Sequence, residues 1–350
     1  LGADISGSEG AAKQGTLYYN YEGEESWEVT ALMKDMGLNA VRLRVWVDPI
    51  RWGRRGAPVD STDNAGLCNK EDVLTNALLA KEQGMEVMIN FHYSDTWADP
   101  ARQPIPRSWR RTYPEMKEDL KAHTVETLQL LKDHGVTPKW VQVGNETNSG
   151  MLHPIGKIGS DATDFAILAN KGYDAVKSIY PEAKVIIHRS EGHKVNECSW
   201  LFSNLKKSNV KYDIIGLSLY PTWWENNGWC DWKPVVDDCL TTIKSLTSTF
   251  GKPVMICEIG MPVWEPQMSK NAVQYILDET KKMSDEELRE QTFLFRKRLA
   301  AGETLDDLLE EIIGEIEDEH DNTNYEAKKI GENEYKLSGR LEIERINELF

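Results

Sequence analysis

Two glutamates end short apolar segments of this sequence and could carry out acid–base chemistry together. Glu146 closes residues 139–146, and Glu258 closes residues 253–258. An apolar β-type segment that ends in a carboxylate is typical of a parallel strand that delivers a charge to the mouth of an α/β barrel. Hydrolysis of a glycosidic bond needs two such groups, a general acid/base and a nucleophile. We therefore predict that Glu146 and Glu258 are a catalytic pair. The alternative for Glu146 is a salt-bridged side chain at a strand end.

The residues beside each glutamate suggest different roles. An acid that donates a proton at neutral pH needs a raised pKa, which burial at a barrel mouth would supply to Glu146. The preceding Asn145 could bind the substrate hydroxyl next to the reacting carbon. A nucleophilic Glu258 needs the opposite, a pKa lowered by a cation and by hydrogen-bond donors.

Arg42 and Arg44 lie in an apolar segment, where an arginine is costly unless it is paired. Both have the same parity on the predicted strand. We favour Arg44 as the cation beside Glu258 and leave a structural pairing for Arg42. Tyr220, which ends residues 214–220, could donate its hydroxyl to the same carboxylate. Its alternative role is a packed tyrosine at the barrel rim.

Histidines and tryptophans supply further candidate site residues. His92 and His188 follow apolar segments at matching strand ends, which favours a place in the active-site lining over a purely structural hydrogen bond. Neither has a third ligand at useful spacing, so no metal site is expected. Indole rings in loops after strands could form sugar platforms, or they could be part of the core. The candidate platforms are Trp97, Trp223, Trp224 and Trp264.

Alternating strand and helix patterns could position these residues. The predicted strands cover residues 2–6, 39–47, 86–92, 139–144, 184–188, 212–219 and 253–258. The predicted helices cover residues 26–36, 70–83, 113–134, 162–179 and 235–250. Such alternation predicts a parallel sheet with crossover helices, hence an α/β fold of the (β/α)8 TIM-barrel type. Seven strands are recognised, and the eighth is not.

Composition limits the possible partners and compartments. The net charge of −16 argues against nucleic acid and anionic membranes as partners and is compatible with a neutral substrate. No apolar run is long enough to span a bilayer, no signal peptide is recognised, and the chain starts at Leu1, as a processed or truncated chain would. The five cysteines show no zinc-site spacing, although a Cys230–Cys239 bridge is possible. We expect a monomer without a cofactor.

A change in composition near residue 283 predicts two units. Residues 284–350 contain 20 Asp and Glu against 9 Lys and Arg, and no tryptophan or proline. We therefore predict a barrel over 1–283 and an acidic α+β tail over 284–350. In the tail, residues 324–339 alternate like a hairpin around Gly331-Glu332-Asn333.

The segments that carry these residues resemble glycoside hydrolase family 53, the endo-β-1,4-galactanases. The resemblance covers residues 1–283 through four segments, 42–49, 91–100, 143–148 and 213–221, and ends at residues 256–260. It implies a retaining glycosidase, with Glu146 as acid/base, Glu258 as nucleophile and β-1,4-galactan side chains of pectin as substrate. Asp95 lies in the second of these segments and is expected to contact substrate. The resemblance also implies a secreted, periplasmic or cell-surface protein.

The sequence departs from the family in its last part. The strand-eight signature is missing, and the last loops, which bind calcium in some bacterial members, are absent. The tail resembles fragments of the SecA translocase over residues 284–309 and of the CorC/HlyC transporter-associated domain over 310–350, which suggests a chimeric terminus. Without an eighth strand a barrel has two open edges. The alternatives are therefore a non-hydrolytic carbohydrate-binding or fold-compromised barrel, and another retaining endo-glycanase of the same clan. Residues 334–337 are the best substitute for the missing strand.

Overall fold

The structure is a computed structural model. It describes residues 1–13, 15–20, 25–26, 28–49, 68–221, 232–260, 274–276, 278–279, 327–329 and 335–337. The chain divides into two compact units, Leu1–Ile276 and Leu277–Phe350.

Seven parallel strands form one sheet in the first unit, in the order β1-β4-β5-β6-β9-β10-β11. Their bounds are β1 Gly2–Asp4, β4 Ala40–Val45, β5 Glu86–Phe91, β6 Trp140–Val143, β9 Lys184–Arg189, β10 Ile214–Leu219 and β11 Val254–Ile259. Each corresponds to one of the seven predicted strands, so the predicted order is confirmed. Spatial neighbours in this sheet are consecutive along the chain, as the connectivity of a (β/α) barrel requires.

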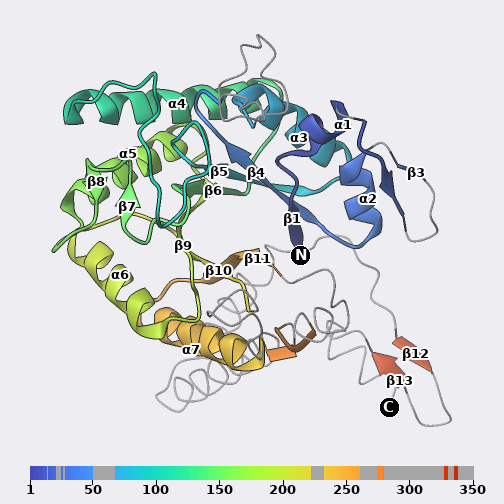
Figure 1. The fold of residues 1–350 in the computed structure, drawn as a ribbon. Helices are drawn as coiled ribbons and strands as arrows, with labels where there is room; N and C mark the ends of the chain where they lie inside the picture. Colours follow the sequence, from blue (N-terminus) through green and yellow to red (C-terminus); the bar gives the residue numbers. More distant parts are fainter. Residues whose placement is uncertain are drawn as a thin grey trace, which may run out of the picture. The chain divides into compact units, whose positions relative to one another are not determined.

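Helices lie between successive strands and follow an arc around the outside of the curved sheet (Figure 1). They are α1 Ser8–Lys13, α2 Val29–Asp35, α3 Lys70–Glu82, α4 Tyr113–Asp133, α5 Thr163–Ile179, α6 Val195–Lys207 and α7 Trp232–Phe250. The five predicted helices are confirmed within a few residues at their ends, while α1 and α6 were not predicted.

Local sequence explains where two of these helices begin. The Glu28 carboxylate caps α2 by accepting hydrogen bonds from the amides of Thr30 at 2.7 Å and Ala31 at 2.6 Å. Asn69 and Asp72 form a reciprocal capping box at the start of α3. Such side chains pair backbone amides that have no partner within the helix.

Two short antiparallel pairs of strands lie in the connections between the parallel strands. β2 (Tyr18–Tyr19) pairs with β3 (Glu25–Ser26), and β7 (Gly150–Met151) pairs with β8 (Gly156–Lys157). The second pair follows Glu146 directly in the chain and shapes the loop after β6.

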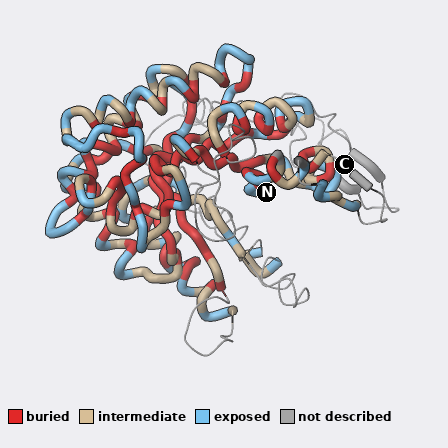
Figure 2. The backbone as a smooth tube through the Cα atoms, turned by 45° about the horizontal axis from the view of Figure 1, so that its top comes forward, coloured by how far each residue is buried: buried red, intermediate tan, exposed pale blue. Residues whose placement is uncertain are grey.

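The core lies between the strands and the inner faces of the helices, as the buried colouring of Figure 2 shows. β10 is buried at every position, whereas β11 is only partly buried and β1 is mostly exposed. β1 and β11 are the edge strands of the described sheet. Cys239 has a buried free thiol, which excludes the Cys230–Cys239 bridge.

The segment suggested as a substitute for the eighth strand lies in the second unit, and its role in closing the barrel stays a prediction. In the second unit β13 (Tyr335–Leu337) pairs antiparallel with β12 (Ala327–Lys329) in a separate two-stranded sheet. The hairpin predicted over residues 324–339 is therefore confirmed. One of its two strands, β13, covers most of the segment suggested as the eighth strand. Within the described ranges, β1 and β11 each have a single neighbour in the seven-stranded sheet.

None of the helices in the described ranges has the length and apolar character needed to cross a lipid bilayer.

Close packing of α5 on β6 generates a stability prediction. A Cβ at Gly172 would lie 2.8 Å from Val143 Cγ1. We expect Gly172→Ala to lower the free energy of unfolding by up to about 2 kcal/mol, because overpacking costs about 1–3 kcal/mol and the helix-propensity gain returns only about 1 kcal/mol. In a Val143→Ala background the same change should become stabilising, as urea unfolding of the four proteins would measure. Stabilisation by Gly172→Ala in the wild-type background would contradict this packing.

Candidate active site

The carboxyl ends of the parallel strands open into a cleft of about 680 Å³. Its lining includes Trp97, Asn145, Glu146, Tyr220 and Glu258. These residues come from the ends of β6, β10 and β11 and from the loop after β5, so strands far apart in sequence meet in one place. Active sites of (β/α) barrels lie at this end of the strands.

The two glutamates face each other across this cleft. One carboxylate oxygen of Glu146, one of Glu258 and a ring nitrogen of His188 all lie within 4.8 Å of one another. Retaining glycosidases separate their carboxyl groups by about 5–5.5 Å, whereas inverting enzymes need about 6.5–9.5 Å to admit a water molecule. The observed proximity fits the retaining arrangement.

Glu146 is held in a strained backbone conformation. Its φ is 44°, in the left-handed region that non-glycine residues rarely adopt. The Gln103 side chain donates to the Asn145 carbonyl at 2.9 Å, and the Thr147 amide donates to the His188 carbonyl at 2.8 Å. Neighbouring loops and strands thus impose this conformation, and such strain clusters at functional sites.

The environment of Glu146 favours its protonated form. Burial, followed by the nearby charge of Glu258, raises the pKa of Glu146 to about 7, although a hydrogen bond from Ser218 and the charge of Arg42 act in the opposite direction. A carboxylic acid with this pKa keeps a proton near neutral pH and can donate it.

Glu258 has the opposite environment. Burial opposes its ionisation, yet the charge of Arg42 and the hydrogen bond from Tyr220 hold the pKa of Glu258 below its ordinary value. Arg42 Nη2 forms an ion pair with Oε1 at 2.8 Å, and the Tyr220 hydroxyl donates to Oε2 at 2.7 Å. The expected contact from Tyr220 is confirmed, and Glu258 is an anion suited to nucleophilic attack.

The preference for Arg44 over Arg42 as the cation beside Glu258 is wrong. The Arg44 guanidinium instead lies 3.8 Å from the Trp97 ring centroid and 4.9 Å from that of Trp46. Both arginines point into the barrel, as their shared parity predicted. Arg44 lies one pleat nearer the strand end, where the two indoles cover it, while Arg42 reaches across the interior to β11.

Trp97 combines exposure with a rigid support. Its side chain is 49% exposed in the cleft, and Arg44 stacks against it. The His92 ring also meets it edge-on, with centroids 5.6 Å apart. An exposed ring held in this way is a suitable platform for a sugar face, which stays a prediction for Trp97.

The other predicted site residues occupy different places. His92 and His188 are fully buried beneath the cleft, and Asn145 is buried in its floor. His92 accepts the Ala98 amide at 3.0 Å and so positions the loop after β5. The Asp95 carboxylate accepts hydrogen bonds from Arg107 and from the Asp48 amide, so its predicted substrate contact stays a prediction. Trp223, Trp224 and Trp264 lie outside the described residues.

Three polar residues of this site were not singled out from the sequence. Asn90, Gln142 and Ser218 are fully buried between apolar neighbours on β5, β6 and β10. An isolated polar residue inside an apolar strand was the available signal, because burying it without partners is costly.

Glu146, His188 and Glu258 are the described acidic and histidine side chains whose donor atoms could surround a metal ion. The Arg42 guanidinium 2.8 Å from Glu258 would repel a cation there, and both His188 nitrogens have hydrogen-bond partners. The arrangement is better suited to proton transfer than to metal binding.

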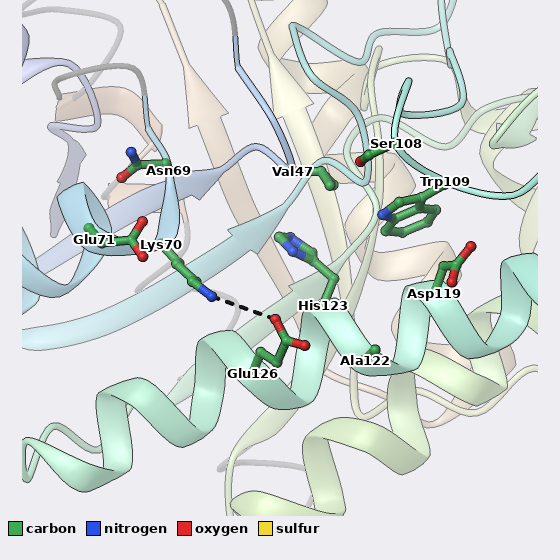
Figure 3. Close-up of a pocket in the computed structure, with 10 residues that line it drawn as sticks. All are labelled: Val47, Asn69, Lys70, Glu71, Ser108, Trp109, Asp119, Ala122, His123 and Glu126. Carbon is green, nitrogen blue, oxygen red and sulfur yellow. Dashed lines mark ion pairs between the residues drawn. The ribbon is translucent and has the colours of Figure 1, made fainter. Parts of the chain in front are cut away.

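A second pocket of about 260 Å³ lies between α3 and α4 (Figure 3). Two of its three carboxylates have basic partners: Glu126 pairs with Lys70 at 3.5 Å, and Asp119 pairs with Arg110. It therefore lacks a facing pair of carboxylates with opposed proton affinities, and the cleft remains the candidate active site.

An α/β fold of the (β/α)8 barrel type, with two close carboxylates of opposite proton affinity at its strand ends, defines a glycoside hydrolase. The chain belongs to glycosyl hydrolase family 53, whose sequence profile matches residues 1–296. That match extends beyond residue 283, where composition placed the end of the barrel. The (β/α)8 fold and glycosidase activity expected from the sequence resemblance are thereby confirmed.

Relatives of known name and structure support this membership. The chain is 30% identical over 261 residues to an endo-β-1,4-galactanase of Bacillus subtilis, covering 73% of this chain and 55% of that protein. The family 53 catalytic domain of Ignisphaera aggregans superposes with a TM-score of 0.64 at 32% identity, covering 74% of this chain and 67% of that one. A fungal β-1,4-galactanase gives a TM-score of 0.64 at 28% identity, covering 75% and 74%. The chain thus spans little more than half of the Bacillus protein.

The donor on Glu258 generates a kinetic prediction. Tyr220→Phe should lower kcat/KM by about tenfold or more, because a hydrogen bond to a charged group is lost. The pKa of Glu258 should rise, so the acidic limb of the pH profile of kcat/KM should move to higher pH. Tyr173→Phe, which removes a hydroxyl 3.5 Å from Asp213 far from the cleft, is the matched control. An unmoved acidic limb would show that Tyr220 does not tune Glu258.

Proposed function

We propose that the protein hydrolyses internal β-1,4-galactosidic bonds in the galactan and arabinogalactan side chains of pectin, with retention of anomeric configuration. The observation that carries the proposal is the pair Glu146 and Glu258, within 4.8 Å of each other and with pKa shifts in opposite directions. The names of the family 53 relatives supply the galactan specificity.

In the first step Glu258 attacks the anomeric carbon of the sugar. Glu146 donates its proton to the glycosidic oxygen as the carbon–oxygen bond breaks, and a glycosyl ester forms on Glu258. Arg42 and Tyr220 keep Glu258 ionised before attack. The Glu146 pKa of about 7 keeps the required proton available.

In the second step a water molecule replaces the departed sugar. Glu146, now a carboxylate, takes a proton from this water as its oxygen attacks the anomeric carbon, and Glu258 is released. Formation of the ester removes the charge of Glu258 only transiently, because hydrolysis of the ester restores it. The same environment then restores the starting protonation of both groups.

The cleft supports binding of a neutral chain as well as chemistry on it. Trp97 presents an indole face beside the carboxylates, and Asn145 lies at the floor next to Glu146. A neutral polysaccharide is compatible with the net charge of −16. We extend the proposal to a monomer that acts at the cell surface, in the periplasm or after secretion, where such polymers are met.

The substrate assignment can be tested with purified polysaccharides. We expect reducing ends to be released from β-1,4-galactan much faster than from arabinan, mannan or xylan. The first products should be β-anomers by NMR, because two displacements retain configuration. Glu258→Ala should abolish turnover while galactan binding persists.

Other outcomes of this assay would contradict the proposal. Galactan binding without hydrolysis by the wild-type chain would favour a non-hydrolytic barrel. Retained hydrolysis by Glu258→Ala would exclude Glu258 as the nucleophile, and initial α-anomers would exclude retention. Faster hydrolysis of xylan or mannan would indicate another endo-glycanase.

The proposed sugar platform generates a separate prediction. Trp97→Ala should raise KM for galactan about tenfold with little change in kcat, since burial of a large apolar side chain is worth about 1.5–3 kcal/mol. Arg44→Met should raise KM less, because it removes only the cation under the ring. Trp200→Ala is the matched control, an equally exposed indole (49%) on α6. Equal KM values for Trp97→Ala and the control would remove Trp97 from the binding site.

A further inference from the structure

We propose that His188 and Ser218 are positioning residues for Glu146. The Ser218 hydroxyl, oriented by His188, donates a hydrogen bond to Oε1 of Glu146, so that Oε2 carries the proton that is transferred. This inference rests on the proposed function of Glu146 as acid/base. It deepens that function by assigning the proton to one atom and by naming the residues that fix it.

The first link is the orientation of Gln142. Its Oε1 accepts a hydrogen bond from Arg42 Nη2 at 3.1 Å, and because a guanidinium can only donate, the Gln142 amide nitrogen must point the other way. That nitrogen lies 3.0 Å from His188 Nδ1. Arg42 thus fixes which end of Gln142 faces the imidazole.

The second link is the tautomer of His188. The amide of Glu146, which can only donate, lies 3.3 Å from the same Nδ1. Asn145 Oδ1 also lies 3.2 Å from Nδ1, but this oxygen already accepts hydrogen bonds from Arg42 at 2.9 Å and from Asn90 at 3.2 Å. The Glu146 amide hydrogen, by contrast, has a fixed direction toward Nδ1, so Nδ1 accepts and does not carry a hydrogen. Burial lowers the pKa of His188 to about 3, so the ring is neutral and its single N–H is on Nε2.

The third link is the Ser218 hydroxyl. His188 Nε2 lies 2.8 Å from Ser218 Oγ, and Ser218 Oγ lies 2.7 Å from Glu146 Oε1. Because Nε2 donates to Oγ, the one hydroxyl hydrogen of Ser218 is left for Oε1. Both side chains are fully buried, so water does not compete for either bond.

The consequence concerns the two oxygens of Glu146. Oε1 accepts the Ser218 hydrogen, and the carbonyl oxygen of a carboxylic acid is a stronger hydrogen-bond acceptor than its hydroxyl oxygen. The acidic proton is therefore on Oε2, which gives it to the glycosidic oxygen in the first step and takes one from water in the second. The Ser218 hydrogen stays on Oγ throughout and stabilises the carboxylate form.

Several other charged or titratable groups act on Glu146. Among the described residues they are Glu258 on β11, Arg42 on β4, Asp99 in the loop after β5, His188 on β9 and Tyr220 after β10. Ser218→Ala leaves all of them in place, so its effect isolates the hydroxyl.

The test compares the pKa of Glu146 and the kinetics of variants at Ser218. In Ser218→Ala the pKa of Glu146 should rise from about 7, seen by ¹³C NMR of labelled glutamates assigned with Glu146→Gln. The alkaline limb of kcat/KM should move up with it, while the acidic limb stays. Turnover of galactan should fall about 10- to 100-fold. An aryl glycoside with a leaving group that needs no proton should be affected much less.

Matched variants separate this role from simple damage to the fold. Ser218→Thr keeps the hydroxyl and should keep the wild-type pKa, whereas Ser218→Cys, a weaker donor, should raise it even if Ser218→Ala does not fold. Ser178→Ala removes a remote hydroxyl on α5 and should change nothing. An unchanged Glu146 pKa in the Ala and Cys variants, or equal losses on both substrates, would overturn the inference. The NMR titration needs no substrate, so a wild-type chain inactive on galactan would contradict the proposed function and leave this test readable.

Discussion

One buried guanidinium organises the cleft. Arg42, with a side chain 7% exposed, contacts Asp4 on β1, Gln142 on β6, Asn145 after it and Glu258 on β11. A buried cation is tolerated only when its charge and its donors are satisfied, so four positions, three on other strands and one directly after β6, must be polar for this one residue. The curved sheet makes these contacts possible, because the strands involved are distant in sequence but converge at one end of the barrel.

Through these contacts Arg42 acts on the two glutamates in different ways. It meets Glu258 directly at 2.8 Å and helps keep that carboxylate ionised. Its charge also opposes the rise in the pKa of Glu146, without a direct hydrogen bond, and it orients Gln142 beside His188. The nearby Glu258 charge and burial then raise the proton affinity of Glu146. A single fixed charge thus supports an asymmetry between two chemically identical side chains, and retaining glycosidases depend on that asymmetry.

The sequence predicted the sheet well because strand and helix periods alternate clearly and each strand is apolar. The strand-end positions of Glu146, Glu258 and Tyr220 followed from the same pattern. Helix α6 was missed although Cys198, Leu201 and Leu205 lie on one buried face. The choice between Arg42 and Arg44 could not be made, since parity places both inside and only the three-dimensional crossing of the barrel decides which one reaches β11.

The position of Arg42 between Asp4 and Glu258 has a consequence for the architecture as well as for the site. β1 and β11 are the two edge strands of the described sheet, and this guanidinium joins a carboxylate from each. In the described sheet β1 and β11 are not paired through their backbones, and the ion pairs of Arg42 with Asp4 and Glu258 link them instead. In the proposed cycle Glu258 loses its charge while it is esterified. For part of every turnover, Asp4 is therefore the only one of these two carboxylates that balances the charge of Arg42. The reaction would therefore briefly weaken the ionic link between the two edge strands.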